Sequence, residues 1–218
     1  MYKQLNLFDL AHSKSYQYRD YILLEQNKDT YNMLMNYDLW SCFILYGKSG
    51  SGKTHLAHIW QKLKNASFIH QGPIAKTMHT IHNSNAFIIE DIDKIKDETW
   101  MLHCYNYAKE NNKLLLMTSS VPPKSLNCSL KDLKSRVLST MSASLASPNE
   151  ELLKIMLIKL FTDHQLHINL KTINYILNNT ERSFKNLRNI VNCIDRELSN
   201  KINGITISFV KWIIEKNA

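Results

Sequence analysis

One eight-residue stretch, Gly47 to Thr54, constrains the fold of this chain more than any other. It reads GKSGSGKT and fits the pattern G-x-x-x-x-G-K-[ST] without a gap. The apolar run before it (42–46) predicts a buried strand, and residues 55–63 place apolar side chains at helical spacing. In this context the turn aims backbone N–H groups at an anion, and the helix adds its positive end. A flexible Gly/Ser linker is the alternative, but linkers are not flanked by such elements.

The loop supplies a full set of predicted phosphate contacts. Lys53 would reach the β- and γ-phosphates of a nucleotide, and the Thr54 hydroxyl would hold Mg²⁺. The predicted nucleotide-binding residues of this region are Gly47, Lys48, Ser49, Gly50, Ser51, Gly52, Lys53, Thr54 and His55.

The composition of the 218 residues is that of an ordinary globular protein, with 44% hydrophobic and 21% charged residues. No apolar run is long enough to cross a membrane, and we expect no secretory signal, because the first residues contain no basic segment followed by an apolar core. The four cysteines form no C-x-x-C pair, so we expect free thiols in a reducing cytosol and no zinc site. The formal charge of +8 comes mostly from scattered lysines, which are more typical of a solvated surface than of a DNA-binding patch.

Predicted strands and helices alternate from about residue 40 to residue 146. The expected strands span 43–46, 67–70, 86–89, 113–118 and, more weakly, 142–146. The expected helices span 54–64, 98–110 and 130–138. This alternation is typical of an α/β fold, in which a parallel sheet, here of five strands, is covered on both faces.

The pattern changes at Ser147, which forms a predicted capping box with Glu150 and has Pro148 between them at the first helical position. Apolar stripes at helical spacing follow from there. We therefore expect three segments: a polar leader over residues 1–16, an α/β domain over 17–146 and a small all-α domain over 147–218.

An apolar strand over residues 87–89 ends in the acids Glu90, Asp91 and Asp93. A phosphate-binding loop needs such a neighbour, because Mg²⁺ takes oxygen ligands and a carboxylate orients the attacking water. We expect Glu90 to join Thr54 in holding the metal and Asp91 to act in catalysis, and we interpret Asp93 as a surface acid. A core strand capped by solvated acids is the alternative.

Two further positions can carry chemistry. The strand over 113–118 runs on into hydroxyl side chains up to Ser120, which either hydrogen-bond a γ-phosphate or water or simply end the strand. The helix over 130–138 carries Arg136 near its end. An arginine can stabilise a transferring phosphoryl group, often on a neighbouring subunit, although most arginines on helices are surface residues.

Five segments in this order resemble the AAA+ module of the DnaA/Hda family of replication proteins: the phosphate-binding loop, the acidic strand end, and residues 118–124 (TSSVPPK), 133–136 (LKSR) and 183–189 (SFKNLRN). The resemblance covers about residues 17–216. It implies an AAA+ P-loop NTPase domain followed by a helical lid, with ADP or ATP and Mg²⁺ as ligands. We expect no helix-turn-helix domain after the lid, in which respect the chain is similar to the short members of the family.

The N-terminal residues 4–8 read QLNLF, close to the pentapeptide Q-L-[SD]-L-F by which many replication proteins dock on the β sliding clamp. An extended peptide of this kind places Leu7 and Phe8 in an apolar pocket while Gln4 hydrogen-bonds at its edge. We therefore predict that Gln4, Leu5, Leu7 and Phe8 bind the clamp. A leader that packs on its own domain is the alternative.

The resemblance also assigns roles to single residues. It makes Arg136 an arginine finger that acts in trans on ATP bound to DnaA, and it places Tyr21 and Ile22 near the adenine. Ser120 stands where the family often has a sensor Asp, and Lys185 stands where a second-sensor Arg usually lies. Lysine keeps the positive charge but loses the bidentate fork of arginine.

These departures, with Glu90 where an Asp usually comes first, would weaken hydrolysis of the chain's own nucleotide and leave Arg136 intact. We therefore expect a clamp-dependent regulator with weak or no ATPase activity alone, which promotes hydrolysis of DnaA-bound ATP and prevents re-initiation. The implied partners are the β sliding clamp and DnaA, with DNA reached only through the clamp, no membrane, and a second copy of the chain left open. The alternatives are a helicase-loader-type (DnaC/IstB-like) ATPase, which gives residues 4–8 no role, and a P-loop kinase, which would lack the lid.

Overall fold

The computed structural model describes residues 23, 25–181, 183–198 and 204–216. Five strands form one sheet in the order β2-β3-β4-β1-β5, and every neighbouring pair is parallel. The strands are β1 (Cys42–Tyr46), β2 (Ser67–Ile69), β3 (Ala86–Ile89), β4 (Leu114–Ser119) and β5 (Met141–Ser144). The expected parallel sheet is confirmed, and each expected strand overlaps an observed one, with its ends shifted by two residues at most.

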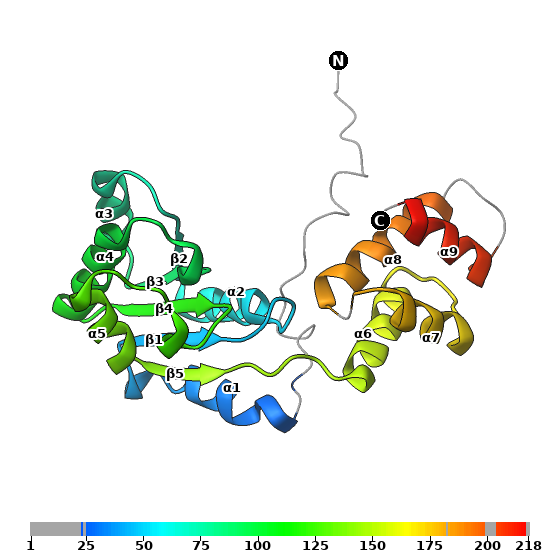
Figure 1. The fold of residues 1–218 in the computed structure, drawn as a ribbon, viewed down its shortest axis with the longest axis horizontal. Helices are drawn as coiled ribbons and strands as arrows, with labels where there is room; N and C mark the ends of the chain where they lie inside the picture. The colour runs from blue at the N-terminus through cyan, green and yellow to red at the C-terminus, as the bar shows by residue number, and fades with distance from the viewer. Residues whose placement is uncertain (1–22, 24, 182, 199–203, 217–218) are drawn as a thin grey trace, which may run out of the picture.

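Helices cover both faces of this sheet (Figure 1). They are α1 (Lys28–Met35), α2 (Lys53–Lys64), α3 (Ile74–His82), α4 (Glu98–Glu110) and α5 (Lys131–Ser139). The prediction included α2, α4 and α5 but omitted α1 and α3. In both omitted helices the buried residues are few, Thr30 and Leu34 in α1 and Thr77 and Ile81 in α3, so the apolar stripe is short.

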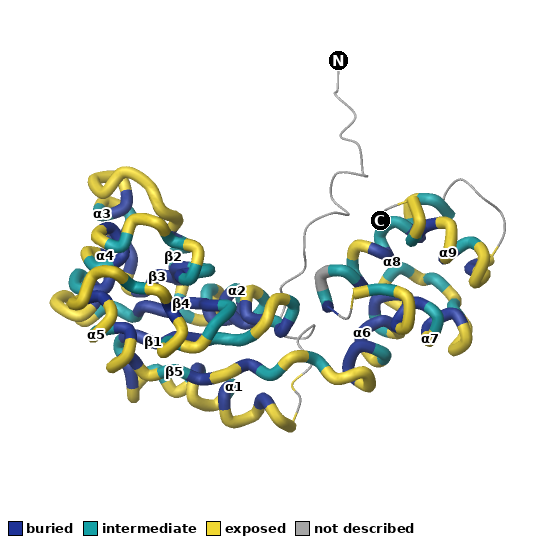
Figure 2. The backbone as a smooth tube through the Cα atoms, viewed as in Figure 1, coloured by how far each residue is buried: buried dark blue, intermediate teal, exposed yellow. Residues whose placement is uncertain are grey.

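The alternation of side chains along the strands builds two separate cores. Cys42 and Ile44 of β1 point toward the core formed with α3, α4 and α5, whereas Phe43 and Leu45 point toward the core formed with α1 and α2. The second core includes Trp60, which is fully buried. Figure 2 shows the central strands as an almost continuous buried layer. Burying one such large side chain stabilises the fold by roughly 1.5–3 kcal/mol.

After β5, four helices of the described residues form a third core. They are α6 (Glu150–Asp163), α7 (Leu170–Asn179), α8 (Phe184–Leu198) and α9 (Ile207–Lys216). Their apolar faces, including Leu157, Ile176 and Val191, meet one another, and an extended segment joins them to the sheet (Figure 1). The predicted all-α region therefore has a core of its own, and we call these four helices the lid helices. Among the described residues, no helix is both long and apolar enough to span a bilayer.

The predicted cap of the first lid helix was wrong. Helix α6 begins at Glu150, and its N-cap is Asn149, whose side chain accepts a hydrogen bond from the Leu152 N–H at 2.9 Å. Ser147 and Pro148 therefore precede the helix and do not start it. Asparagine is as strong an N-cap as serine, so the capping box pattern did not distinguish the two positions.

Candidate nucleotide-binding site

The loop that joins β1 to α2 has the backbone that a phosphate-binding turn requires. Gly50 and Gly52 have φ angles of 78° and 101°, in the left-handed region that only glycine adopts at little cost. Gly52 is the N-cap of α2, and Lys53 is the first residue of that helix. The N–H groups of the first turn of a helix have no acceptor within the helix, and here the glycine-rich turn brings them to the carboxyl edge of the sheet.

Two other parts of the chain approach this loop closely. A Cβ atom on Gly47 would overlap the carbonyl oxygen of Leu145, which follows β5. A Cβ atom on Gly50 would lie 2.6 Å from the Cβ of Ser183, the residue that precedes α8. The loop is therefore in contact with the segment leading to the lid helices and with the start of α8.

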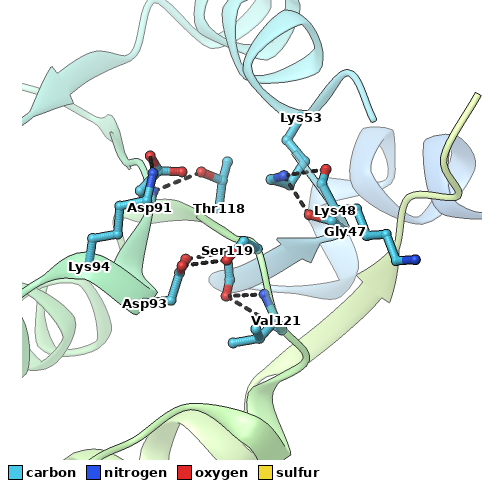
Figure 3. Close-up of polar contacts among 10 residues, drawn as sticks. Gly47, Lys48, Lys53, Asp91, Asp93, Lys94, Thr118, Ser119 and Val121 are labelled. Carbon is cyan, nitrogen blue, oxygen red and sulfur yellow. Dashed lines mark hydrogen bonds and ion pairs between the residues drawn. The ribbon is translucent and has the colours of Figure 1, made fainter. Parts of the chain in front are cut away.

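Lys53 is the charged group at the centre of the loop. Its side chain is buried, with 8% of the residue exposed, and Nζ donates hydrogen bonds to the carbonyl oxygens of Gly47 at 2.5 Å and Lys48 at 3.0 Å (Figure 3). Burial lowers the pKa of this amine, and the nearby carboxylates of Asp91, Asp93 and Glu90 oppose that shift. A buried ammonium that is held only by carbonyl oxygens lacks an anionic partner, which a phosphate would supply.

Ser51 gives an independent indication that the loop fits a phosphate. Its residue is 3% exposed, and its hydroxyl oxygen is buried without a hydrogen-bond partner among the described residues. Leaving such a group unsatisfied costs about 1–3 kcal/mol. The lysine, the unsatisfied hydroxyl and the left-handed glycines together fit a bound di- or triphosphate.

The acidic segment after β3 lies across from Lys53. Asp91 has φ 52°, so the chain turns sharply there, and its N–H donates to the Thr118 hydroxyl of β4 at 3.0 Å. The Asp91 carboxylate accepts a hydrogen bond from Lys94 at 2.7 Å (Figure 3). Glu90, directly after β3, is partly exposed. The end of β3 is thus fastened to the end of β4, and both acids stand beside the loop.

Asp93 is not the free surface acid that we inferred from the sequence. It is partly buried, and its two carboxylate oxygens accept hydrogen bonds from Ser120, one from the N–H at 2.9 Å and one from the hydroxyl at 2.5 Å. Burial raises the pKa of Asp93, but the hydrogen bonds from Ser120 outweigh it, and the pKa lies below its ordinary value of 3.8. Asp93 is therefore ionised at neutral pH and is held at the end of β4.

Arg136 lies in the last turn of α5. Its Nε is 3.4 Å from a carboxylate oxygen of Asp132, and its guanidinium carbon is 5.9 Å from the centre of the Tyr105 ring on α4. Its side chain is 40% exposed. The contacts that hold Arg136 thus come from α4 and α5, and a good part of the side chain remains accessible to another molecule.

Glu98, which the sequence analysis did not single out, holds the chain just before α5. Each carboxylate oxygen of Glu98, the first residue of α4, accepts a backbone N–H, from Ser129 at 2.8 Å and from Leu130 at 2.6 Å. Leu130 is the N-cap of α5 and provides no side-chain cap. Glu98 therefore fastens the two residues that precede the helix carrying Arg136.

Several predicted site residues lie outside the described residues or only partly within them. Gln4, Leu5, Leu7, Phe8, Tyr21 and Ile22 all lie outside. Lys185 lies in the first turn of α8, which begins beside Gly50, but its side chain is outside the described part. For the metal, the described residues contain no group of three or more His, Cys, Asp or Glu side chains placed so that they alone could hold an ion. Thr54 and Glu90 remain the proposed ligands, because Mg²⁺ usually takes few protein ligands and completes its shell with water and phosphate oxygens.

The sheet order, the loop between β1 and α2 and the lid helices define the AAA+ fold of P-loop NTPases. A family model described as RNA helicase matches residues 43–144. The chain is 24% identical over 253 residues to the chromosomal replication initiator protein DnaA of Buchnera aphidicola, an alignment that covers 99% of this chain and 57% of that protein. The chain thus spans about half the length of the curated relatives that it matches.

Solved structures of DnaA have the same fold. Domain III of Thermotoga maritima DnaA aligns with a TM-score of 0.74 at 16% identity, covering 94% of this chain and 97% of that one. AMPPCP-bound DnaA from Aquifex aeolicus aligns with a TM-score of 0.66 at 18% identity, covering 84% of this chain and 65% of that one. The chain therefore has the AAA+ fold and is DnaA-like in sequence.

Proposed function

We propose that this chain binds an adenine nucleotide with Mg²⁺ at the loop and acts as a DnaA-related regulator of the Hda type. In this proposal it docks on the β sliding clamp through residues 4–8 and promotes hydrolysis of ATP bound to DnaA. The observation that carries the proposal is the pairing of a nucleotide site with an accessible arginine held elsewhere. Lys53 and Ser51 lack a partner that a phosphate would supply, whereas Arg136 contacts Tyr105 of α4 and Asp132 of α5.

The similarity to DnaA supports an adenine nucleotide in particular, because one of the similar structures is a complex with AMPPCP. The loop residues Gly47 to Thr54 and His55 would hold the phosphates, and Lys53 would leave the carbonyls of Gly47 and Lys48 for them. Thr54 and Glu90 would hold Mg²⁺, and Lys185 would approach from α8. When bound, the metal would neutralise phosphate charge, and Asp91 would orient water.

The departures at Glu90 and Ser120 support weak hydrolysis of the chain's own nucleotide. Ser120 donates its hydroxyl proton to Asp93, so that hydroxyl is not available to donate to a phosphate in the arrangement observed. Arg136 depends on neither residue. Stabilisation of transferring phosphoryl charge on another subunit requires only that the guanidinium be accessible and well oriented. The Tyr105 and Asp132 contacts provide the orientation.

One experiment tests nucleotide binding, with ADP and ATP titrated calorimetrically into the full chain. We expect Lys53→Ala to abolish binding and the matched control Lys76→Ala, at an exposed position of α3, to bind like the unchanged protein. Equal binding by the Lys53 variant would place the nucleotide elsewhere.

A second experiment tests the regulatory role. Hydrolysis by cognate DnaA is measured with DNA-loaded clamp and this chain, its Arg136→Ala variant or the control Lys134→Ala on the same helix. The proposal expects acceleration by the unchanged chain and the control, and loss with Arg136→Ala. If the chain binds nucleotide but none of the three proteins accelerates hydrolysis, the regulator role is rejected, and a loader-type ATPase becomes the next function to test.

A further inference from the structure

The carboxylate of Asp93 is placed at the end of the central strand β4 by the chain itself. Both of its oxygens are used, one by the Ser120 N–H and one by the Ser120 hydroxyl. The left-handed turn at Asp91 and the short helical turn over 92–94 carry Asp93 back toward β4. The negative charge of the Asp93 carboxylate therefore lies beside Ser120, although Ser120 itself is neutral.

This charge lies beside the phosphate-binding loop, because Ser120 directly follows Ser119, whose carbonyl oxygen accepts a hydrogen bond from the Gly47 N–H of the loop at 3.1 Å. Asp93 is one of three carboxylates, with Asp91 and Glu90, whose charge acts on the buried Lys53 amine. Asp91 is paired with Lys94 at 2.7 Å, whereas the two hydrogen bonds that fasten Asp93 come from neutral groups of Ser120. Asp93 thus keeps a full negative charge next to the site, and Ser120 fixes its position.

We propose that Asp93 is a positioning residue of the nucleotide site, which accepts hydrogen bonds from the water shell of nucleotide-bound Mg²⁺. This inference rests on the proposed nucleotide binding. Bound Mg²⁺ keeps several water molecules, which are hydrogen-bond donors, and an ionised carboxylate is an acceptor only. Outer-shell carboxylates of this kind orient the ligands of a metal, and their loss typically weakens metal binding by about 10–100-fold.

A purely structural role makes a different prediction. In that case Asp93 serves only to accept the Ser120 hydrogen bonds and lock the turn. An asparagine at this position keeps one oxygen to accept a hydrogen bond but has no charge. Asp93→Asn therefore separates the two roles, because it removes the charge and preserves most of the packing.

The test measures dissociation constants of the full chain for ATP and ADP, each with Mg²⁺ and with a chelator. We expect Asp93→Asn to weaken Mg²⁺-dependent binding about tenfold or more and to leave Mg²⁺-free binding within about twofold of the unchanged protein. Glu110→Gln, at the exposed end of α4, is the matched control for the change in net charge. Circular dichroism melting of each variant without nucleotide checks the fold.

A relocation of the charge gives a second, independent readout. Ser120→Asp puts two carboxylates side by side and should weaken Mg²⁺-dependent binding through repulsion and loss of the fastening hydrogen bond. The double variant Asp93→Asn, Ser120→Asp returns a single carboxylate to the end of β4. We expect this double variant to recover at least half of the binding free energy that Asp93→Asn loses.

The outcomes distinguish this inference from the proposed function. If the unchanged protein binds nucleotide and Asp93→Asn has the same Mg²⁺ dependence, Asp93 is structural and the inference is refuted, while nucleotide binding stands. If Asp93→Asn weakens binding equally with and without Mg²⁺, the effect is a general distortion and the inference is again refuted. If the unchanged protein binds no nucleotide, the proposed function and this inference both fall.

Discussion

Replacement of Gly50 by alanine tests whether the loop and the lid helices meet as the structure describes. Two penalties follow from the geometry. The φ angle of 78° is in the left-handed region, where a non-glycine residue costs about 1–2 kcal/mol. The new Cβ would also lie 2.6 Å from the Cβ of Ser183, well inside the ~3.5–4.0 Å at which carbon atoms touch favourably.

The expected loss of stability is the sum of these two penalties. Overpacking of a close contact costs about 1–3 kcal/mol, so we expect Gly50→Ala to lower the free energy of unfolding by roughly 2–5 kcal/mol. The matched control is Gly72→Ala, because the nearest atom to a Cβ there is 3.9 Å away and the φ angle is not positive. That substitution should be neutral or stabilise by about 0.4–1 kcal/mol.

The assay is urea unfolding followed by circular dichroism, in a double-mutant cycle with Ser183→Gly. Removing the Ser183 side chain relieves the shorter contact but leaves the Ser183 Cα at 3.2 Å and the φ strain, so the double variant should recover part of the overpacking penalty of about 1–3 kcal/mol relative to Gly50→Ala. Ser183→Gly alone should cost only a few tenths of a kcal/mol as a cap substitution. A coupling energy near zero would show that Gly50 and Ser183 do not touch in solution, and an effect of Gly50→Ala equal to that of Gly72→Ala would refute the reasoning entirely.

Three further predictions concern other parts of the fold. Lys113→Met removes an ammonium that donates to three carbonyl oxygens at the end of α3, and it should cost about 1.5–3 kcal/mol in urea unfolding, whereas Lys76→Met, at an exposed position of α3, should cost little. Backbone hydrogen bonds hold the pKa of Glu98 below its ordinary value of 4.5, so its contribution is present above that pH and is lost as pH falls through the lowered pKa. Glu98→Gln should therefore flatten the acid limb of a stability–pH curve below about pH 4.5, and an unchanged limb would contradict the role assigned to the two hydrogen bonds that this carboxylate accepts. Burial raises the pKa of Cys42 to about 11 and of Cys104 to about 12, so at neutral pH an alkylating reagent should label the two partly exposed cysteines first and these two only on unfolding, as counted by mass spectrometry.

Most of the sheet could be predicted from sequence because buried parallel strands are short apolar runs with clear ends. The run 86–89 was predicted to the residue, and even the weak strand at 142–146 overlaps β5. Helices α1 and α3 were missed because each buries only a short stripe beneath a largely polar surface. In α3, Ile74, Met78 and Ile81 have the i, i+4, i+7 spacing that could have revealed it.

The role of Asp93 could not be predicted because it depends on one backbone angle. In a regular strand, side chains alternate between faces, and Asp93 follows Asp91 at that spacing. The left-handed φ of Asp91 breaks the alternation and carries Asp93 to Ser120, a contact across 27 residues of sequence. The two hydrogen bonds that Glu98 accepts could not be predicted for a related reason, since its partners Ser129 and Leu130 lie more than thirty positions away.

The approach of Leu145 to Gly47 has a consequence for comparing this chain with its homologues. The loop's first glycine is required where the exit from β5 crosses it, whether or not a nucleotide is ever bound. Tyr46 and Leu145 are also joined there by a backbone hydrogen bond of 2.7 Å. In homologues that no longer bind a nucleotide, we therefore expect Gly47 to be retained and Lys53 to be replaced by other residues. In an alignment, a retained lysine at position 53 therefore indicates that the site still binds its ligand. A retained glycine at position 47 indicates only that two chain segments still cross there.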